Sequence, residues 1–440
     1  MIRISDLNKH EGKTVSINGW LYGRTDKGKL QFLLIRDGTG TVQCVIFEDD
    51  VSGEVYQKSI ELTQESSLIV TGKVKEDKRA PGGYELSVSD LSVIQKAKDD
   101  YPIQLKEHGV EHLMKHRHLW LRSSQQQSIL RIRAEIIRSS REWLDTHGFI
   151  NLDTPIITPL SVEGTTTLFP VDYFGEEVYL TQSGQLYNEA LAMAFGRVYS
   201  CGPVFRAERS KTRRHLTEFW MIEPEIAFCD LAELMEIEEQ FIAYIVANVI
   251  KNRREDLINL EQDISMLEKV VPPFPKITYD DALDLLQSIR DQLENPNERD
   301  ELSIEWGSDF GAPHDAAISG RYDKPVFITH YPTEAKAFYM QPKDGRPDVS
   351  LSADLLAPDG YGEIIGGGQR IANPEVLLDR LSQHNLNQEI YEWYTDLRRF
   401  GSVNHSGFGM GVERLTTWIC GRRHIRETIA FPRLYKYINM

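Results

Sequence analysis

The chain has 440 residues and a formal net charge of -16, a length that predicts two or three domains with a large core. The acidic balance argues against non-specific binding to nucleic acid, because the overall field repels phosphate. The sequence shows no bilayer-length apolar run, no signal-peptide core and no metal-type or disulfide-framework spacing among its four cysteines. We therefore expect a cytoplasmic protein without a membrane segment.

Residues 1–95 alternate apolar and polar positions in five short runs, among them 15–21, 30–36 and 67–74. Turn-forming residues at 37–40 and 80–83 separate these runs. Short alternating strands of this kind predict a small closed barrel of the oligonucleotide-binding type, the OB-fold. Phe32 lies in one of the strands, where it is either a core residue or a platform on which a base stacks.

Residues 96–125 form a charged, His-rich connector. Lys115, Arg117 and Arg122 lie among its histidines and would repel a cation, so we do not interpret the histidines as a metal site. Apolar residues at helical spacing, including Ile129, Ile132 and Ile136, then predict a helix from about residue 126 to 147.

Residues 204–228 place two apolar strand-like segments around a loop in which positions 209–215 are all basic or hydroxyl-bearing. This pattern predicts an antiparallel hairpin with a cationic tip. Its arginines and His215 suit a polyphosphate, because guanidinium forks bind phosphate oxygens bidentately. Phe219 on the returning strand is placed to stack on a nucleobase.

Three further segments show no pattern that predicts a functional role. Residues 229–262 are acidic and amphipathic, which indicates a solvated surface helix. Residues 287–301 are charge-rich around a central Asn-Pro-Asn and indicate an exposed insertion. We do not interpret the triplet at 309–311, Asp-Phe-Gly, as a kinase signature, because no catalytic-loop motif precedes it.

Two blocks near the C-terminus carry candidate ligand contacts. Asp354 and Glu363 are separated by a turn, so on adjacent strands they can share a hard cation such as Mg²⁺, which binds through one or two carboxylates plus substrate phosphates. Residues 407–415 contain three alternate glycines followed by Glu413 and Arg414. This pattern indicates a strand that a ligand approaches closely, leading into a helix that presents Arg414.

These blocks together resemble a known family. The hairpin with Phe205-Arg206-Ala207-Glu208, the Arg214-His215 pair and Phe219 resembles motif 2 of the class II aminoacyl-tRNA synthetases, and residues 407–415 resemble motif 3. Residues 126–155 resemble motif 1, and residues 181–189, Thr-Gln-Ser-Gly-Gln-Leu-Tyr-Asn-Glu, resemble a block of the aspartyl and asparaginyl group. The chain is identified as a member of the aspartyl, asparaginyl and lysyl subgroup over nearly its whole length.

The resemblance implies an α+β fold, with an antiparallel-sheet class II catalytic domain at 126–440 and an N-terminal OB-fold anticodon-binding domain at 1–95. Residues 96–125 become the hinge between them. It further implies a homodimer built through motif 1. The implied reaction activates L-asparagine with ATP and Mg²⁺ to asparaginyl-adenylate and then transfers asparagine to tRNA(Asn).

The resemblance also implies roles for individual residues. The catalytic residues are Arg206, Glu208 and Arg414. ATP is bound by Arg206, Glu208, Arg214, His215, Phe219, Glu363 and Arg414, and the metal by Asp354 and Glu363. The amino acid is bound by Glu163, Gln185, Glu223, Glu225 and Arg370, with the loop 161–166 closing over it. The anticodon is bound by Arg24, Phe32 and Gln43, with Lys27 and Lys29 near the RNA backbone.

Two positions depart from the aspartyl relatives. Asn188 stands where the aspartyl relatives have a lysine that helps to hold the substrate carboxylate, and the absence of that lysine favours asparagine as the substrate. Gly366 stands where those relatives have a serine that binds the metal, so the metal would have fewer protein ligands or a water in its coordination shell. An aspartyl-tRNA synthetase and a paralogue that makes asparagine from aspartyl-adenylate remain alternatives, although the predicted barrel counts against the paralogue. A non-catalytic regulator is a third alternative, against which the retained phosphate and metal residues count.

Overall fold

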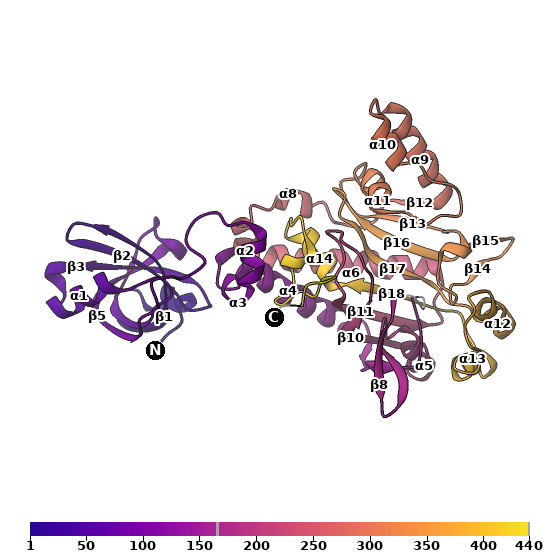
Figure 1. Ribbon diagram of the computed structural model, residues 1–440, viewed down its shortest axis with the longest axis horizontal. Helices are drawn as coiled ribbons and strands as arrows, with labels where there is room; N and C mark the ends of the chain where they lie inside the picture. The colour runs from indigo at the N-terminus through magenta and orange to yellow at the C-terminus, as the bar shows by residue number, and fades with distance from the viewer. Residues whose placement is uncertain (164–166, 439–440) are drawn as a thin grey trace. The chain divides into compact units, whose positions relative to one another are not determined.

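A computed structural model describes residues 1–163 and 167–438 and divides the chain into two compact units, residues 1–120 and 121–440 (Figure 1). Each unit has its own core and is described by itself. Among the described residues, every helix is too short or too polar to cross a bilayer.

The first unit is a closed five-stranded barrel in the order β1-β2-β3-β5-β4. Its strands are β1 (Thr14–Lys27), β2 (Leu30–Arg36), β3 (Thr41–Phe47), β4 (Ser67–Glu76) and β5 (Tyr84–Gln95). Every second side chain points inward, so that Leu33 and Ile35 of β2 are fully buried. The predicted OB-fold is therefore confirmed. Helix α1 (Gly53–Glu61) joins β3 to β4, and two short helices, α2 (Val110–Lys115) and α3 (Arg117–Trp120), end the unit.

The second unit is built on a sheet that has eight strands within the described residues, in the order β12-β13-β16-β17-β18-β11-β10-β6. These strands are β6 (Ile150–Asn151), β10 (Arg197–Phe205), β11 (Glu218–Ala227), β12 (Lys276–Thr278), β13 (Val326–Thr329), β16 (Ser352–Ala357), β17 (Gly362–Gln369) and β18 (His405–Gly411). The interior pairs are antiparallel, as predicted. The edge pairs β6–β10 and β12–β13 are parallel, because helices lie between those strands in the sequence and supply the crossover that parallel pairing needs.

Helices α4 (Ser124–Thr146), α6 (Leu231–Asn252) and α14 (Val412–Ile419) form the main core with the sheet. The prediction that α6 is a solvated surface helix is wrong, because Phe241, Ile245 and even Glu238 are fully buried. Neither carboxylate oxygen of Glu238 has a hydrogen-bond partner among the described residues. Burial and nearby Asp354 raise its pKa well above the usual range, so Glu238 is a neutral acid inside the core.

The remaining helices are α5 (Gln185–Phe195), α7 (Arg254–Asn259), α8 (Ile264–Leu267), α9 (Tyr279–Gln292), α10 (Pro296–Glu301), α11 (Ala312–Ser319), α12 (Pro374–Gln383) and α13 (Glu392–Arg399). Small sheets are formed by β7 (Ile157–Thr158), β8 (Phe169–Tyr173) and β9 (Glu176–Leu180), and by β14 (Pro342–Lys343) and β15 (Arg346–Ser350). The charge-rich segment 287–301 forms the end of α9 and all of α10, and α10 buries none of its residues. In Figure 1, α9, α10 and α11 lie together beside β12 and β13, and α12 and α13 lie together at the lower right.

Candidate active site

The predicted hairpin is formed by β10 and β11, which pair from Arg197–Ile226 to Phe205–Glu218. Arg206 follows the last residue of β10, and its backbone N–H donates to the Thr217 carbonyl oxygen over 3.0 Å. The guanidinium of Arg206 lies over the Phe219 ring, 5.5 Å from its centroid. Its Nε is buried and has no hydrogen-bond partner among the described residues. A buried donor without a partner is costly, so this N–H is available to a ligand.

A cavity of about 120 Å³ opens beside this hairpin. It is lined by all seven residues predicted to bind ATP, namely Arg206, Glu208, Arg214, His215, Phe219, Glu363 and Arg414. They come from the hairpin, β17 and α14, so three segments far apart in the sequence meet here. Gly409 of β18 also lines the cavity, and a Cβ at this position would lie 2.3 Å from the Met221 Cε. The glycine therefore keeps the strand backbone accessible, as the alternate-glycine pattern predicts.

Arg414 is held by Glu363, and its neighbour Glu413 anchors the helix that carries it. Its Nη1 donates to the backbone oxygen and to Oε2 of Glu363, both at 3.1 Å. The preceding residue, Glu413, accepts from Arg133 Nη2 at 2.6 Å and from the Trp220 backbone N–H at 3.0 Å. Glu413 thereby ties α14 to α4 and β11, which explains why the motif needs a carboxylate next to its arginine.

The other basic side chains of this cavity do not all carry a charge. Burial and neighbouring Arg414 lower the pKa of His215, so at neutral pH this imidazole is uncharged. Its Nε2 lies 3.7 Å from Glu208 Oε2. Arg214 donates to the Gly360 carbonyl oxygen and lies 3.5 Å from Asp315 Oδ2. Burial lowers the pKa of Arg206, but Glu163, Glu208 and Glu363 outweigh it and raise the pKa overall, so Arg206 stays a cation.

A second cavity of about 250 Å³ adjoins the first and shares Arg206, Glu363 and Gly409 with it. It is lined by all five predicted amino-acid-binding residues, namely Glu163, Gln185, Glu223, Glu225 and Arg370, and by Asp354. The predicted closing loop is described only up to Glu163, and its residues 164–166 lie outside the described residues.

Gln185 begins α5 and lies one turn before Glu189. Its Nε2 donates to Glu189 Oε1 over 3.1 Å. Because that contact fixes the amide, the Gln185 carbonyl oxygen is left to accept from an ammonium group in the cavity. Glu189 itself is fully buried and also receives hydrogen bonds from Tyr394, Arg398 and His405. No sequence pattern indicates this network, because its members lie on α5, α13 and β18.

Arg370 and Glu225 form a bidentate ion pair inside the cavity wall. Arg370 Nε and Nη2 donate to the two Glu225 carboxylate oxygens, each at 3.0 Å, and both side chains are almost completely buried. Both residues are predicted to be separate substrate contacts, whereas in the structure they neutralise each other. Arg370 Nη1, which lies 3.6 Å from the Met340 sulfur, is the guanidinium nitrogen left to meet a ligand oxygen.

Glu223 is engaged in a similar way. It accepts from the Ser183 hydroxyl and from the Gly184 backbone N–H at 2.9 Å, and burial raises its pKa. Asn188 does not line the cavity. It is fully buried behind it, where its Nδ2 donates to Ser200 Oγ and to the Glu223 backbone oxygen, both at 2.9 Å.

Asp354 and Glu363, the predicted metal ligands, lie on the neighbouring strands β16 and β17. A Cβ on Gly366 would lie 2.7 Å from Glu363 Oε1 and 3.6 Å from Asp354 Oδ1, so the two carboxylates flank this glycine. A serine at this position would crowd Glu363. Lys336, which sequence analysis missed, donates from Nζ to Asp354 Oδ2 over 2.6 Å.

The acidic character around these ligands extends to two other aspartates. Burial, with Glu363 and Asp309 nearby, raises the pKa of Asp354 to about 7. Asp315, next to Arg214, is also raised to a pKa of about 7, by burial and by Glu363. Asp309 lines the second cavity, although the sequence offers only an uninformative Asp-Phe-Gly triplet there. Two facing carboxylates in an acidic cavity fit a hard divalent cation.

Two of the three predicted anticodon residues share one face of the barrel. Phe32 is half-buried and lies outside the barrel core, and its register neighbours place Gln43 on the same outer face. Lys27 Nζ lies 5.9 Å from the Phe32 ring centroid. Arg24 is not on this face. It pairs with the inward-facing Leu33, and its guanidinium donates to the carbonyl oxygens at the end of α1.

Comparisons with known proteins agree with this geometry. Residues 109–435 match the family model for class II tRNA synthetases of the D, K and N type, and residues 15–94 match the OB-fold nucleic-acid-binding domain. The chain therefore belongs to the class II tRNA synthetases specific for aspartate, lysine and asparagine.

Several relatives at 52–55% identity are named asparagine–tRNA ligase. The asparagine–tRNA ligase of Chloroflexus aurantiacus is 55% identical over 435 residues, covering 98% of both chains. That of Koribacter versatilis is 54% identical over 434 residues, covering 98% of this chain and 97% of the relative. The structure of Pyrococcus horikoshii asparaginyl-tRNA synthetase complexed with asparaginyl-adenylate superposes with a TM-score of 0.93 at 41% identity, covering 99% of each chain.

Proposed function

We propose that this protein is an asparagine–tRNA ligase, which forms asparaginyl-adenylate and pyrophosphate from L-asparagine and ATP and then charges tRNA(Asn). The observation that carries the proposal is a pair of adjoining cavities. The first cavity is lined by several arginines, and the second contains a buried arginine, Arg370, that Glu225 already neutralises. The names of relatives at 52–55% identity support the same substrate.

Arg206 lines both cavities, so we assign it to the α-phosphate, where the asparagine carboxylate attacks in line. Arg214, His215 and Arg414 would hold the distal phosphates, with adenine between Phe219 and Arg414. Glu208 would accept from the adenine amino group or orient the tRNA end. This chemistry needs positioning and charge neutralisation more than a base, and the buried, partnerless Nε of Arg206 is a preorganised donor.

Asp354 and Glu363 would hold Mg²⁺ together with the ATP phosphates. The ion supplies compensation for the phosphate charge. Lys336 occupies one Asp354 oxygen and Arg414 one Glu363 oxygen, so each carboxylate keeps a further oxygen for an incoming cation. Because Gly366 carries no side chain, water would complete the coordination.

Asparagine is distinguished from aspartate by charge, since the two side chains have nearly the same shape. Gln185 would accept from the ammonium group, with Glu163 at the cavity entrance. Arg370 Nη1 would donate to the side-chain carbonyl oxygen, and Glu225 or Glu223 would accept from the amide nitrogen directly or through water. An aspartate carboxylate would instead meet two acidic groups and an arginine that is already paired.

We assign anticodon binding to residues 1–95, a hinge to 96–125 and catalysis to 126–440. Pairing of two chains is proposed through α4 and β6, the elements of motif 1. The enzyme would act in the cytoplasm, where the charged tRNA is used.

The outer face of the barrel gives a test that separates RNA binding from catalysis. Replacing Phe32 with alanine removes a stacking platform worth roughly 1–3 kcal/mol, so the kcat/KM of aminoacylation should fall about 5- to 150-fold. Asparagine-dependent ATP–pyrophosphate exchange, which needs no tRNA, should stay unchanged. Leu33→Ala is the matched control on the inward face, and it should lower the stability of the barrel. Parallel losses in both assays for Phe32→Ala would contradict a role in RNA binding.

The proposed function is tested by charging. Purified protein with ATP and Mg²⁺ should attach asparagine to a tRNA(Asn) transcript and leave a tRNA(Asp) transcript uncharged. A protein that binds tRNA but forms no adenylate would support the non-catalytic regulator instead.

A further inference from the structure

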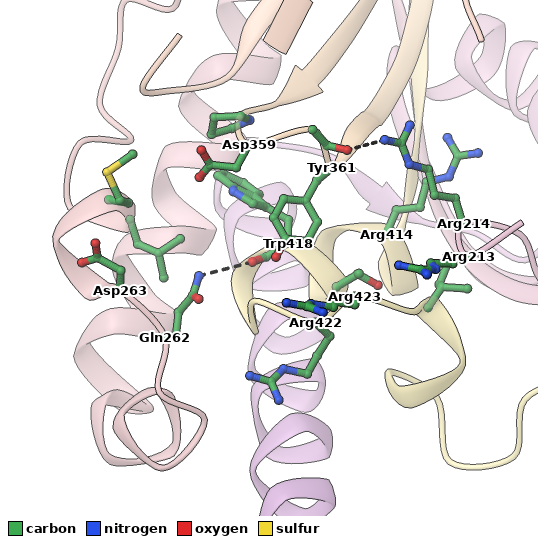
Figure 2. Close-up of a pocket in the computed structure, with 16 residues that line it drawn as sticks. Arg213, Arg214, Gln262, Asp263, Asp359, Tyr361, Arg414, Trp418, Arg422 and Arg423 are labelled. Carbon is green, nitrogen blue, oxygen red and sulfur yellow. Dashed lines mark hydrogen bonds between the residues drawn. The ribbon is translucent and has the colours of Figure 1, made fainter. Parts of the chain in front are cut away.

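A third cavity, of about 510 Å³, lies next to the first cavity, which we assign to ATP and call the nucleotide cavity (Figure 2). No role has been assigned to this third cavity so far. Its walls come from the loop between β10 and β11, from the turn between β16 and β17, from the region of α8, and from α14 with the segment that follows it. It shares Arg214 and Arg414 with the nucleotide cavity. The two arginines assigned to the distal phosphates of ATP therefore also border this space.

The cavity is strongly cationic. Five arginines line it, namely Arg213, Arg214, Arg414, Arg422 and Arg423, against two carboxylates, Asp263 and Asp359. Figure 2 shows Arg213, Arg214 and Arg414 grouped on one side, with both aspartates on the other. Asp263 is already engaged, because it accepts from the Ser265 backbone N–H at 3.0 Å and from its hydroxyl at 2.7 Å. In a chain with a net charge of -16, such a local concentration of arginine indicates an anionic ligand.

Arg214 and Arg414 have partly compensated charges, since they lie 3.5 Å from Asp315 and 3.1 Å from Glu363, but the other arginines of the cavity have no counter-ion among the described residues. The side chains of Arg213 and Arg423 are exposed and form no hydrogen bond or ion pair with residues 1–163 or 167–438. Arg422 donates from Nε to the Cys420 oxygen at 2.8 Å and from Nη2 to the Leu260 oxygen at 2.7 Å, so neutral carbonyls fix its position.

The local field is correspondingly positive. Burial and Arg414 together lower the pKa of Arg214, although Asp315 acts in the opposite direction. Burial, Arg426 and Arg213 lower the pKa of nearby His424 to about 4. A bound anion would relieve this repulsion.

We propose that this cavity binds inorganic pyrophosphate, the second product of adenylate formation, as it leaves the nucleotide cavity. The inference rests on the proposed ligase reaction. Guanidinium forks bind phosphate oxygens bidentately, and the arginines that would hold the β- and γ-phosphates form the shared wall. The phosphate backbone of RNA has the same chemistry, but a cavity of about 510 Å³ bordered by four segments fits a small anion better than a helical strand.

The test uses Arg213→Gln combined with Arg423→Gln, because both side chains are exposed and make no contact that folding needs. Arg254→Gln is the control, since Arg254 is an exposed arginine outside the cavity whose one ion pair, with Glu268, is exposed. The full-length protein is titrated calorimetrically with pyrophosphate, and separately with orthophosphate, in a Mg²⁺ buffer. The inhibition constant of pyrophosphate in the forward reaction and the KM values of ATP and tRNA are then measured.

In the double variant, the dissociation and inhibition constants of pyrophosphate should rise about tenfold, and the KM of ATP should rise less than that. In the Arg254→Gln control, the pyrophosphate constants should change less than about twofold. Orthophosphate, which offers fewer oxygens, should bind more weakly than pyrophosphate to the parent. Unchanged pyrophosphate constants in an active double variant overturn the proposal, as does a raised KM for tRNA without a change in pyrophosphate binding. A parent without asparagine-dependent exchange refutes the ligase function instead, and calorimetry still decides whether the cavity binds pyrophosphate.

Discussion

Replacing Arg206 with alanine is expected to lower asparagine-dependent ATP–pyrophosphate exchange by about 10²–10³-fold, because one preorganised contact to developing phosphate charge is worth ~3–4 kcal/mol. The side chain borders both cavities and carries a buried Nε that has no partner among the described residues. The loss should appear mainly in kcat, since the contact strengthens as the α-phosphate is attacked.

Arg206→Lys is the matched control for charge. Lysine keeps the positive charge but loses the planar fork, so it should restore only part of the activity. Both variants should unfold near the temperature of the parent, because the one ion pair that Arg206 forms with residues 1–163 and 167–438 is long, 3.7 Å to Glu163. Exchange by Arg206→Ala within tenfold of the parent would remove this residue from the catalytic step.

Replacing Glu189 with glutamine is expected to lower the free energy of unfolding by ~3–5 kcal/mol, because it leaves the buried Arg398 charge without its counter-ion. Both side chains have no exposed surface, and Tyr394 and His405 donate to the same carboxylate. Urea unfolding of the catalytic unit measures the change. Glu142→Gln removes the exposed partner of Arg138 and should cost less than about 1 kcal/mol.

The same network gives a pH dependence. Burial raises the pKa of Glu189, but Arg398, His405 and Arg370 outweigh it and depress the pKa well below the ordinary 4.5. A depressed carboxyl pKa stabilises the folded state fully above the unfolded value and progressively less below it. The stability difference between the parent and Glu189→Gln should therefore shrink as the pH falls below about 4.5. An equal difference at pH 7 and pH 4 would show that Glu189 contributes by packing alone.

The barrel and the hairpin could be predicted because their signals are local. Alternation in β2 places Leu33 inside and Phe32 outside, and the cationic loop after Arg206 is continuous in the sequence. The lining of the two adjoining cavities could also be assembled from residues named in advance, since each belongs to a short block that resembles a family motif. The sheet edges could not be derived in the same way, because parallel pairing depends on which helices intervene.

The contacts within the site were beyond sequence reasoning. Arg370 and Glu225 are 145 positions apart, and nothing local shows that they neutralise each other. Lys336 lies in a loop without a motif, yet it contacts Asp354. The acidic composition of α6 predicts that its carboxylates are exposed to solvent. Glu239 is nevertheless buried, and its carboxylate accepts from the Phe274 backbone N–H at 2.9 Å. This partner is distant in the sequence, so the burial could not be predicted from α6 alone. The sequence likewise does not show whether the charge of Arg24 meets RNA or, as in the structure, the carbonyl oxygens at the end of α1.

The pocket that contains Arg370, already neutralised by Glu225, is expected to select an amide over a carboxylate. ATP–pyrophosphate exchange measured with asparagine and with aspartate tests this selection most directly. A carboxylate facing Glu225 and Glu223 would be under-paired at a cost of ~3–5 kcal/mol in a desolvated site, so asparagine should be preferred by at least about 10²-fold in kcat/KM. Asn188→Lys, which adds a cation behind Glu223, should narrow this ratio without reversing it. A parent enzyme that activates aspartate as well as asparagine would contradict the account.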